Sequence, residues 1–276
     1  MQVILTVNMG NTAVSFALYR VGADASDAAP LSMFRISAAP QRTADEYAVL
    51  LSAMADRGGA EIEMTSMIVA SVVPARTGEL CDALRLLYPS AALLTVGAGL
   101  RSGLTIRTDS PAELGADLVA MAVGAAALQK PPFLVLDCSA VTTLSAVDAD
   151  KDAPAYLGCA ILPGPALGAE VLKGHAALLS DVLLQKPKSA IGKNSADSLR
   201  SGLVLGFVAS LTELIDRFEC EIGKGMLTVI LTGEHAAMVK PLLRHTLRED
   251  GELVHRGLYK MALLNARKNG KAPERG

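Results

Sequence analysis

Two short turns and one acidic segment carry the residue types that could bind phosphate and move a proton. The first turn, Asn8-Met9-Gly10-Asn11-Thr12, follows an apolar run typical of a strand. Gly10 can adopt a positive φ and let the backbone approach a phosphate closely, while Asn11 and Thr12 offer short polar side chains. An Asn/Gly turn is also typical of an ordinary hairpin, so both interpretations stay open at this point.

The second turn, Asp137-Cys138-Ser139-Ala140-Val141-Thr142-Thr143, begins with an acid at the end of an apolar strand. A buried carboxylate is costly unless it is paired or binds a cation, so Asp137 should face a cleft, a metal ion or a group of donors. Thr142 and Thr143 could add hydroxyl groups. Two such turns from opposed domains would hold a nucleoside triphosphate.

The acidic segment is Gly115-Ala116-Asp117, which opens an apolar helical pattern. Asp117 could accept a proton from an attacking hydroxyl group in phosphoryl transfer. It could equally be a first-turn acid that the helix dipole favours. The sequence of this segment alone does not show whether Asp117 is a proton acceptor or a residue that stabilises the helix start.

Further glycine-containing segments could be plain turns, although Thr232-Gly233, between a strand and a helix, suits a close approach to adenosine. His175 and His235 stand alone in the sequence, and such residues are more often surface or packing histidines than catalytic ones. The cysteines and histidines form no CxxC or HExxH pattern. Reduced thiols are therefore expected rather than a metal or redox site of those types.

Periodicity gives the elements that must position these residues. Strands are expected at residues 3–7, 14–19, 67–73, 92–96, 133–137, 142–147, 156–161 and 227–232. Helices are expected at residues 43–55, 77–87, 111–128, 195–218 and 236–247. Strands followed by helices, twice over, predict two α/β domains.

The two halves of the chain also resemble each other. Leu5–Val14 can be laid over Leu134–Thr143, and Met67–Val73 over Leu227–Gly233. An internal duplication follows, and we expect facing domains, residues 1–115 and 116–276, with a ligand cleft between them.

Composition limits the partners. The chain has 276 residues, 51% of them hydrophobic, and a net charge of −2, so it offers no general electrostatic attraction for nucleic acid or anionic lipid. The longest apolar stretch, Leu118–Leu128, is shorter than the roughly 20 residues that cross a bilayer. The first residues lack the basic region of a signal peptide. We therefore expect a cytoplasmic protein with a small-molecule partner and no membrane association.

From Val3 to about Leu258, the order of motifs resembles that of type III pantothenate kinases. No single motif is specific, but their succession is. The motifs are GNT at 10–12, RTADEYA at 42–48, SVVP at 71–74, GAGLRSGL at 97–104, PAELGAD at 111–117, DCSAVTT at 137–143, YLGCAILPG at 156–164, IGKNSADSLRSG at 191–202 and LTGEHA at 231–236.

The resemblance implies an α/β fold of two duplicated ribonuclease-H-like domains of the actin/Hsp70/sugar-kinase type. It implies transfer of the γ-phosphate of ATP to the primary hydroxyl of pantothenate, the first step towards coenzyme A, in a homodimer that needs Mg²⁺ and a monovalent cation, K⁺ or NH₄⁺. By position, Asp117 matches the catalytic base and Asp137 the acid associated with the monovalent cation. The positions that fall in the nucleotide-binding motifs are Asn8, Gly10, Asn11, Thr12, Asp137, Thr142, Thr143 and Gly233, and those on the substrate side are Thr108, Gly115 and His175.

The departures from the family pattern fall on the same motifs. Asn8 stands where the family has an acid, and Leu118 where it has an arginine. Ser139 and Ala140 replace glycine and threonine, Thr108 replaces a tyrosine, and our alignment sets His175 over a threonine and Cys159 over a glycine. Losing a carboxylate weakens Mg²⁺ orientation, and losing polar anchors weakens binding of a small carboxylate substrate. We therefore expect an impaired pantothenate kinase, with a catalytically inactive homologue of regulatory or nucleotide-binding role, or a kinase for a related small hydroxy acid, as alternatives.

Overall fold

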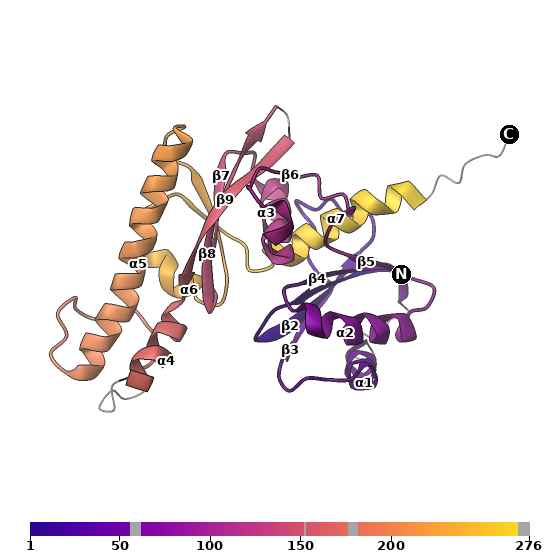
Figure 1. Ribbon diagram of the computed structural model, residues 1–276, viewed down its shortest axis with the longest axis horizontal. Helices are drawn as coiled ribbons and strands as arrows, with labels where there is room; N and C mark the ends of the chain where they lie inside the picture. Colours follow the sequence, from indigo (N-terminus) through magenta and orange to yellow (C-terminus); the bar gives the residue numbers. More distant parts are fainter. Residues whose placement is uncertain (56–61, 152, 176–181, 270–276) are drawn as a thin grey trace. The chain divides into compact units, whose positions relative to one another are not determined.

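The computed structural model describes residues 1–55, 62–151, 153–175 and 182–269 (Figure 1). The chain divides into two compact units, Met1–Gln129 with Glu252–Gly276, and Lys130–Gly251. This division differs from the predicted boundary after residue 115. The segment after that boundary stays with the first unit, and the C-terminal helix returns to it.

The first unit contains a sheet in the order β3-β2-β1-β4-β5. β1 pairs antiparallel with β2 and parallel with β4, while β5 extends the parallel side and β3 the antiparallel side. The strands are β1 (Gln2–Met9), β2 (Ala13–Arg20), β3 (Ser32–Ser37), β4 (Glu63–Ser71) and β5 (Ala92–Thr95). The short β6 (Thr105–Ile106) follows.

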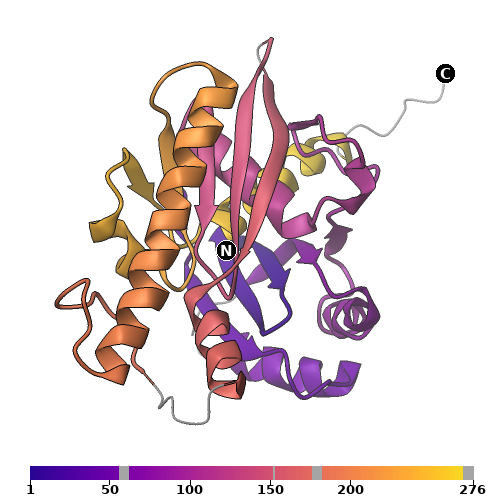
Figure 2. The same ribbon diagram turned by 60° about the vertical axis from the view of Figure 1, so that its left-hand side comes forward.

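The strands of the second unit follow the order β9-β8-β7-β10-β11. They are β7 (Phe133–Asp137), β8 (Val141–Asp150), β9 (Ala153–Pro163), β10 (Thr228–Thr232) and β11 (Leu247–Glu249). Figure 2 shows β8 and β9 as a long hairpin. Order and direction match the first sheet strand by strand, with an antiparallel hairpin next to two parallel strands. The predicted duplication is therefore confirmed.

Helices cover both faces of the first sheet. Alternate residues of β1, from Val3 to Met9, pack in one core with α1 (Ala44–Ala55) and α2 (Pro74–Leu87). Ile4 faces the opposite side, in a core with α3 (Ala116–Leu128) and α7 (Leu253–Asn269). Because side chains alternate along a strand, Asn8 belongs to the face that α3 and α7 cover.

Two glycines set the contact between α3 and α7. A Cβ atom at Gly257 would lie 1.8 Å from the carbonyl oxygen of Ala120, and one at Gly124 would lie 2.2 Å from that of Leu253. Any larger residue at either position would therefore push the helix backbones apart. This close packing fixes α3, and with it Asp117 at its first turn, on the sheet.

In the second unit α5 (Ser195–Ile222) lies along one face of the sheet (Figure 1). By length and composition alone it could cross a membrane. Its apolar stripe, which includes Phe207, Leu211 and Ile215, packs instead against β7 and β10 of its own unit. A membrane span is therefore not needed to explain its apolar character.

Two predicted helices were wrong in extent. The helix expected over 236–247 ends as α6 (Ala236–Val239) and a 3₁₀ turn, η3 (Lys240–Leu242), before β11. The helix expected over 111–128 begins as a separate 3₁₀ turn, η2 (Pro111–Glu113). The elements that the sequence analysis did not predict are β3, β6, β11, α4 (Pro165–His175) and α7.

Candidate active site

In the first unit, the candidate residues lie in and around the turn between β1 and β2. The backbone N–H of Gly10 donates a 2.9 Å hydrogen bond to the carbonyl of Ala13, which closes the turn. Asn11 and Thr12 are exposed at its tip, while Asn8 pairs across the strands with Ser15. The tip of the turn thus presents the short polar side chains of Asn11 and Thr12, whereas the N–H of Gly10 is used within the turn and Gly10 does not adopt the positive φ that its sequence would allow.

Asn8, near the end of β1, has a side-chain oxygen, Oδ1, that is buried and has no hydrogen-bond partner among the residues that the structure describes. A buried acceptor without a donor is costly, so this oxygen suits a bound water, an N–H donor or a cation. A carboxamide oxygen can ligate a hard cation such as Mg²⁺, although it brings no charge to the site.

Asp117 lies in the first turn of α3, beside the same strand ends. The backbone N–H of Leu118 donates a 2.8 Å hydrogen bond to Asp117 Oδ1. Burial raises the pKa of the Asp117 carboxyl, and this N–H opposes the rise. A half-buried carboxylate with a raised pKa is suited to accept a proton.

Gly115 lets the Asp117 segment pack closely against Val72, the residue that follows β4. A Cβ at Gly115 would lie 2.6 Å from Asp117 Oδ1 and 3.7 Å from Val72 Cγ1. The N–H of Val72 bonds in turn to the carbonyl of Met9, at the end of β1. The Gly115–Asp117 segment and the Asn8–Thr12 turn are therefore brought together where parallel strands β1 and β4 end.

A buried series of hydrogen bonds joins the β1–β2 hairpin to α7 next to Asn8. Thr6 Oγ1 lies 3.2 Å from the carbonyl of Ala17 and 2.8 Å from His255 Nδ1, and His255 Nε2 lies 2.9 Å from Ser15 Oγ. If Thr6 donates to Ala17, then Nδ1 must carry the proton and Ser15 donates to Nε2. Burial lowers the pKa of His255 to about 4, so the ring is neutral at pH 7. The sequence analysis missed this residue, because nothing near His255 in the sequence marks it.

In the second unit, the candidate residues lie in and around the turn between β7 and β8. Ser139 Oγ donates a 2.6 Å hydrogen bond to Asp137 Oδ1. Asp137 pairs across the strands with Thr143, which is largely buried. Thr142 is fully buried, and its Oγ1 donates to the carbonyl of Ser139, so this hydroxyl braces the turn.

Two glycines bring other segments against this turn. A Cβ at Gly233 would lie 2.4 Å from Asp137 Oδ1 and 2.7 Å from the backbone nitrogen of Cys138. Gly164, at the start of α4, would place a Cβ 2.3 Å from the carbonyl of Ser139. The segments that contain Gly233 and Gly164 therefore converge on the second turn. From the sequence alone, Gly164 is predicted only to be part of a turn.

The other residues that the sequence placed in the site make fewer contacts with the two turns. Thr108 has a buried Oγ1 without a partner among the described residues. Leu118 is half-buried and offers no charge. His175 ends α4, and its side chain lies outside the described residues. His235 follows Gly233, and its N–H bonds to the carbonyl of Cys138 at 2.9 Å.

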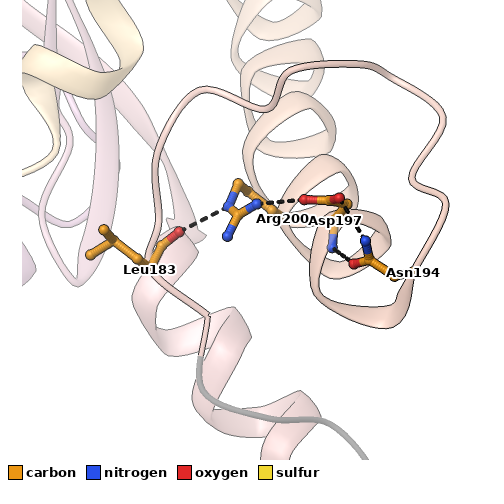
Figure 3. Close-up of polar contacts among 4 residues, drawn as sticks. All are labelled: Leu183, Asn194, Asp197 and Arg200. Atoms are coloured by element: carbon orange, nitrogen blue, oxygen red, sulfur yellow. Dashed lines mark hydrogen bonds and ion pairs between the residues drawn. The ribbon is translucent and has the colours of Figure 1, made fainter.

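The segment before α5 is ordered by polar contacts within the second unit (Figure 3). Asn194 caps α5 by accepting a hydrogen bond from the N–H of Asp197 and donating one to its carboxylate. Arg200 pairs with Asp197 at 2.7 Å and donates to the carbonyl of Leu183. These contacts explain the IGKNSADSLRSG motif as a capped helix start that holds the preceding segment.

Comparison with known protein sequences identifies the family. The sequence model of type III pantothenate kinase matches residues 4–217. This chain belongs to the type III pantothenate kinase family. It is 34% identical to the type III pantothenate kinase of Thermomicrobium roseum, over 92% of this chain and 99% of that one. It is 31% identical to the Dehalococcoides mccartyi enzyme, over 86% of this chain and 88% of that one.

Solved structures agree on the fold. A proposed 2-dehydro-3-deoxygalactonokinase of Sinorhizobium meliloti has a TM-score of 0.59 at 13% identity, covering 99% of this chain and 98% of that one. Component A of the (R)-2-hydroxyglutaryl-CoA dehydratase of Acidaminococcus fermentans has a TM-score of 0.51 at 12% identity, covering 98% and 100%. At these identities the likeness concerns fold alone. The expected actin/Hsp70/sugar-kinase fold is confirmed.

Proposed function

We propose that this family member phosphorylates pantothenate with ATP. Among the site contacts, the observation that carries the proposal is Asp117, a half-buried acid held by the N–H of Leu118 next to the β1–β2 turn. Its raised pKa lets it take the proton of the attacking hydroxyl as the phosphoryl group is transferred. The family match over most of the chain supplies the substrate pair.

The other site residues bind and orient ATP. Asn11 and Thr12 bind phosphate oxygens, because these two residues are exposed at the tip of the β1–β2 turn. In the second unit the Asp137–Thr143 turn binds phosphate. Gly233 belongs to the motif expected to bind adenosine, and its missing Cβ lets this motif lie against Asp137 and the backbone of Cys138. Gly164 places the N-terminus of α4 against the same turn, where a helix end favours an anion.

Mg²⁺, when bound, neutralises the charge that develops on the transferred phosphoryl group. Asn8 Oδ1 fits a role in holding it, because this buried oxygen has no donor among the described residues. Asp137 would hold the monovalent cation. Since its Oδ1 already accepts the Ser139 hydroxyl, K⁺ or NH₄⁺ would bind there less tightly than at a free carboxylate.

The assembly and the compartment are proposals too. We expect a cytoplasmic homodimer in which two copies of the same surface meet. Sedimentation of the full chain at micromolar concentration tests this expectation, and a monomer would contradict it. The relatives named above are called kinases, and none of these findings favours the inactive alternative.

The deciding experiment measures phosphate transfer from ATP to pantothenate by the full chain. Asp117→Asn should abolish turnover and leave the thermal midpoint within a few degrees of the wild type. Glu113→Gln is the matched control, since Glu113 is an exposed acid in the 3₁₀ turn that precedes α3. It should leave turnover unchanged. If Asp117→Asn retains wild-type turnover, or the wild type has none, the proposed function is wrong.

A further inference from the structure

A cluster of metal-ligand residues lies in the second unit, apart from the residues used above. Asp216, Glu219 and His245 each offer one ligand atom, and these atoms all lie within 4.8 Å of one another. Asp216 and Glu219 are three residues apart on α5, so they share one face of the helix. His245 comes from the segment between η3 and β11.

Each residue is held where an ion could reach it. The side chain of His245 is only 9% exposed, and its Nε2 lies 2.9 Å from Asp216 Oδ1. Glu219 Oε1 accepts a 2.8 Å hydrogen bond from the N–H of Leu227, which fixes the carboxylate. Asp216 is 58% exposed, so the cluster opens to solvent on that side.

The histidine ring has unmet hydrogen-bonding capacity. His245 Nδ1 is buried and finds no partner in the described part of the chain. A largely buried imidazole with one unsatisfied nitrogen, next to two carboxylates, is costly as it stands. The other ring nitrogen, Nε2, is the one that faces the carboxylates, and a cation bound between Nε2 and the two acids would offset the repulsion between these acids.

We propose that Asp216, Glu219 and His245 form a binding site for a divalent transition-metal ion of the zinc class. One imidazole nitrogen and two carboxylate oxygens match the ligand preferences of Zn²⁺, and water would complete a four-coordinate shell. Ca²⁺ and Mg²⁺ prefer all-oxygen ligands and should bind less well. The ion would tie α5 to the segment before β11 and so stabilise the second unit.

The experiment uses the full chain with Cys220→Ser, because Cys220 is exposed on the same helix and could bind zinc by itself. Titration calorimetry with Zn²⁺ should show one bound ion per chain, and Zn²⁺ should raise the thermal midpoint more than Ca²⁺ does. His245→Ala and Asp216→Asn should each weaken Zn²⁺ binding at least about tenfold. The matched control is Glu213→Gln, which removes an exposed acid one turn away that pairs with Arg217.

The Zn²⁺ titrations of the parent chain and its variants decide whether the cluster is a metal site. Loss of the calorimetric signal in the two cluster variants, with the signal kept in Glu213→Gln, supports the site. If the parent chain binds no Zn²⁺, or all three variants bind it equally, the cluster is only a hydrogen-bonded pair beside a fixed glutamate and the proposal is overturned. Circular dichroism of each variant shows whether the chain remains folded. If His245→Ala unfolds, the Asp216→Asn result decides.

Discussion

Ser139 Oγ donates a 2.6 Å hydrogen bond to Asp137 Oδ1. The side chain that stands in place of a glycine of the family motif thus occupies one oxygen of the acid in the second turn. A hydroxyl donor there satisfies part of the carboxylate that a cation or water would otherwise satisfy. The substitution therefore changes the ligand capacity of Asp137 without removing its charge.

Ser139→Gly should free this oxygen. We expect ATP affinity to become several-fold more dependent on K⁺ than in the wild type, measured by calorimetry with K⁺ and with an inert organic cation. Ala140→Gly is the control, because it adds similar backbone freedom next to Ser139, and the methyl side chain of Ala140 cannot donate a hydrogen bond to the Asp137 carboxylate. Equal effects of both variants would assign the change to loop flexibility.

Asn8→Asp should restore a charge at the end of β1. The buried, unpartnered Oδ1 of Asn8 becomes part of a carboxylate, which binds hydrated Mg²⁺ better than an amide does. We expect Mg²⁺-dependent ATP affinity to rise roughly tenfold, with turnover rising further when Leu118→Arg is added as an anchor for the substrate carboxylate. Wild-type turnover with ordinary Mg²⁺ dependence would contradict the idea that Asn8 weakens the site.

His255 should make stability depend on pH on the acid side. Its pKa is lowered to about 4 in the folded protein, chiefly by burial, from a model-peptide value of 6.5. The unfolded chain therefore binds a proton first, so the stabilisation is complete above about pH 6.5 and is lost as the pH falls toward 4. The two pKa values imply a loss of about 3 kcal/mol from this residue.

His255→Gln keeps polar atoms near Thr6 and Ser15 but cannot titrate. Urea unfolding between pH 7 and 4 should show a smaller loss of unfolding free energy for this variant than for the wild type. Carboxylates titrate in both proteins, so the difference between the two curves isolates His255. Parallel curves would show that the histidine does not limit acid stability.

Gly257→Ala should separate α3 from α7. Its Cβ would meet the Ala120 carbonyl at 1.8 Å, so we expect a loss of more than about 2 kcal/mol in chemical unfolding. Gly202→Ala is the control in another helix, where a Cβ meets nothing within 4 Å. It should stabilise by about 0.5–1 kcal/mol, because alanine has the higher helix propensity. Similar results for both variants would show that the helices separate without cost.

The sequence by itself determined the duplicated α/β plan and predicted the two turns that are proposed to bind phosphate. Buried strands such as Val3–Val7 and Phe133–Asp137 are mostly apolar, with Thr6 and the terminal Asp137 as exceptions, and this local signal survives in any context. The turns after them carry glycine and short polar residues whose conformational demands are also local. The motif order then indicated the family, which the comparisons confirmed.

Only the tertiary structure decided which distant residues serve these turns. β3 and β11 are short and largely exposed, so they lack the apolar signal that identifies buried strands, and α7 lies far from α3 in the sequence. The contacts of His255 with Thr6 and Ser15, and of Gly233 with Asp137, join residues that are remote along the chain. Such pairings depend on the packing of whole elements, which no local pattern encodes.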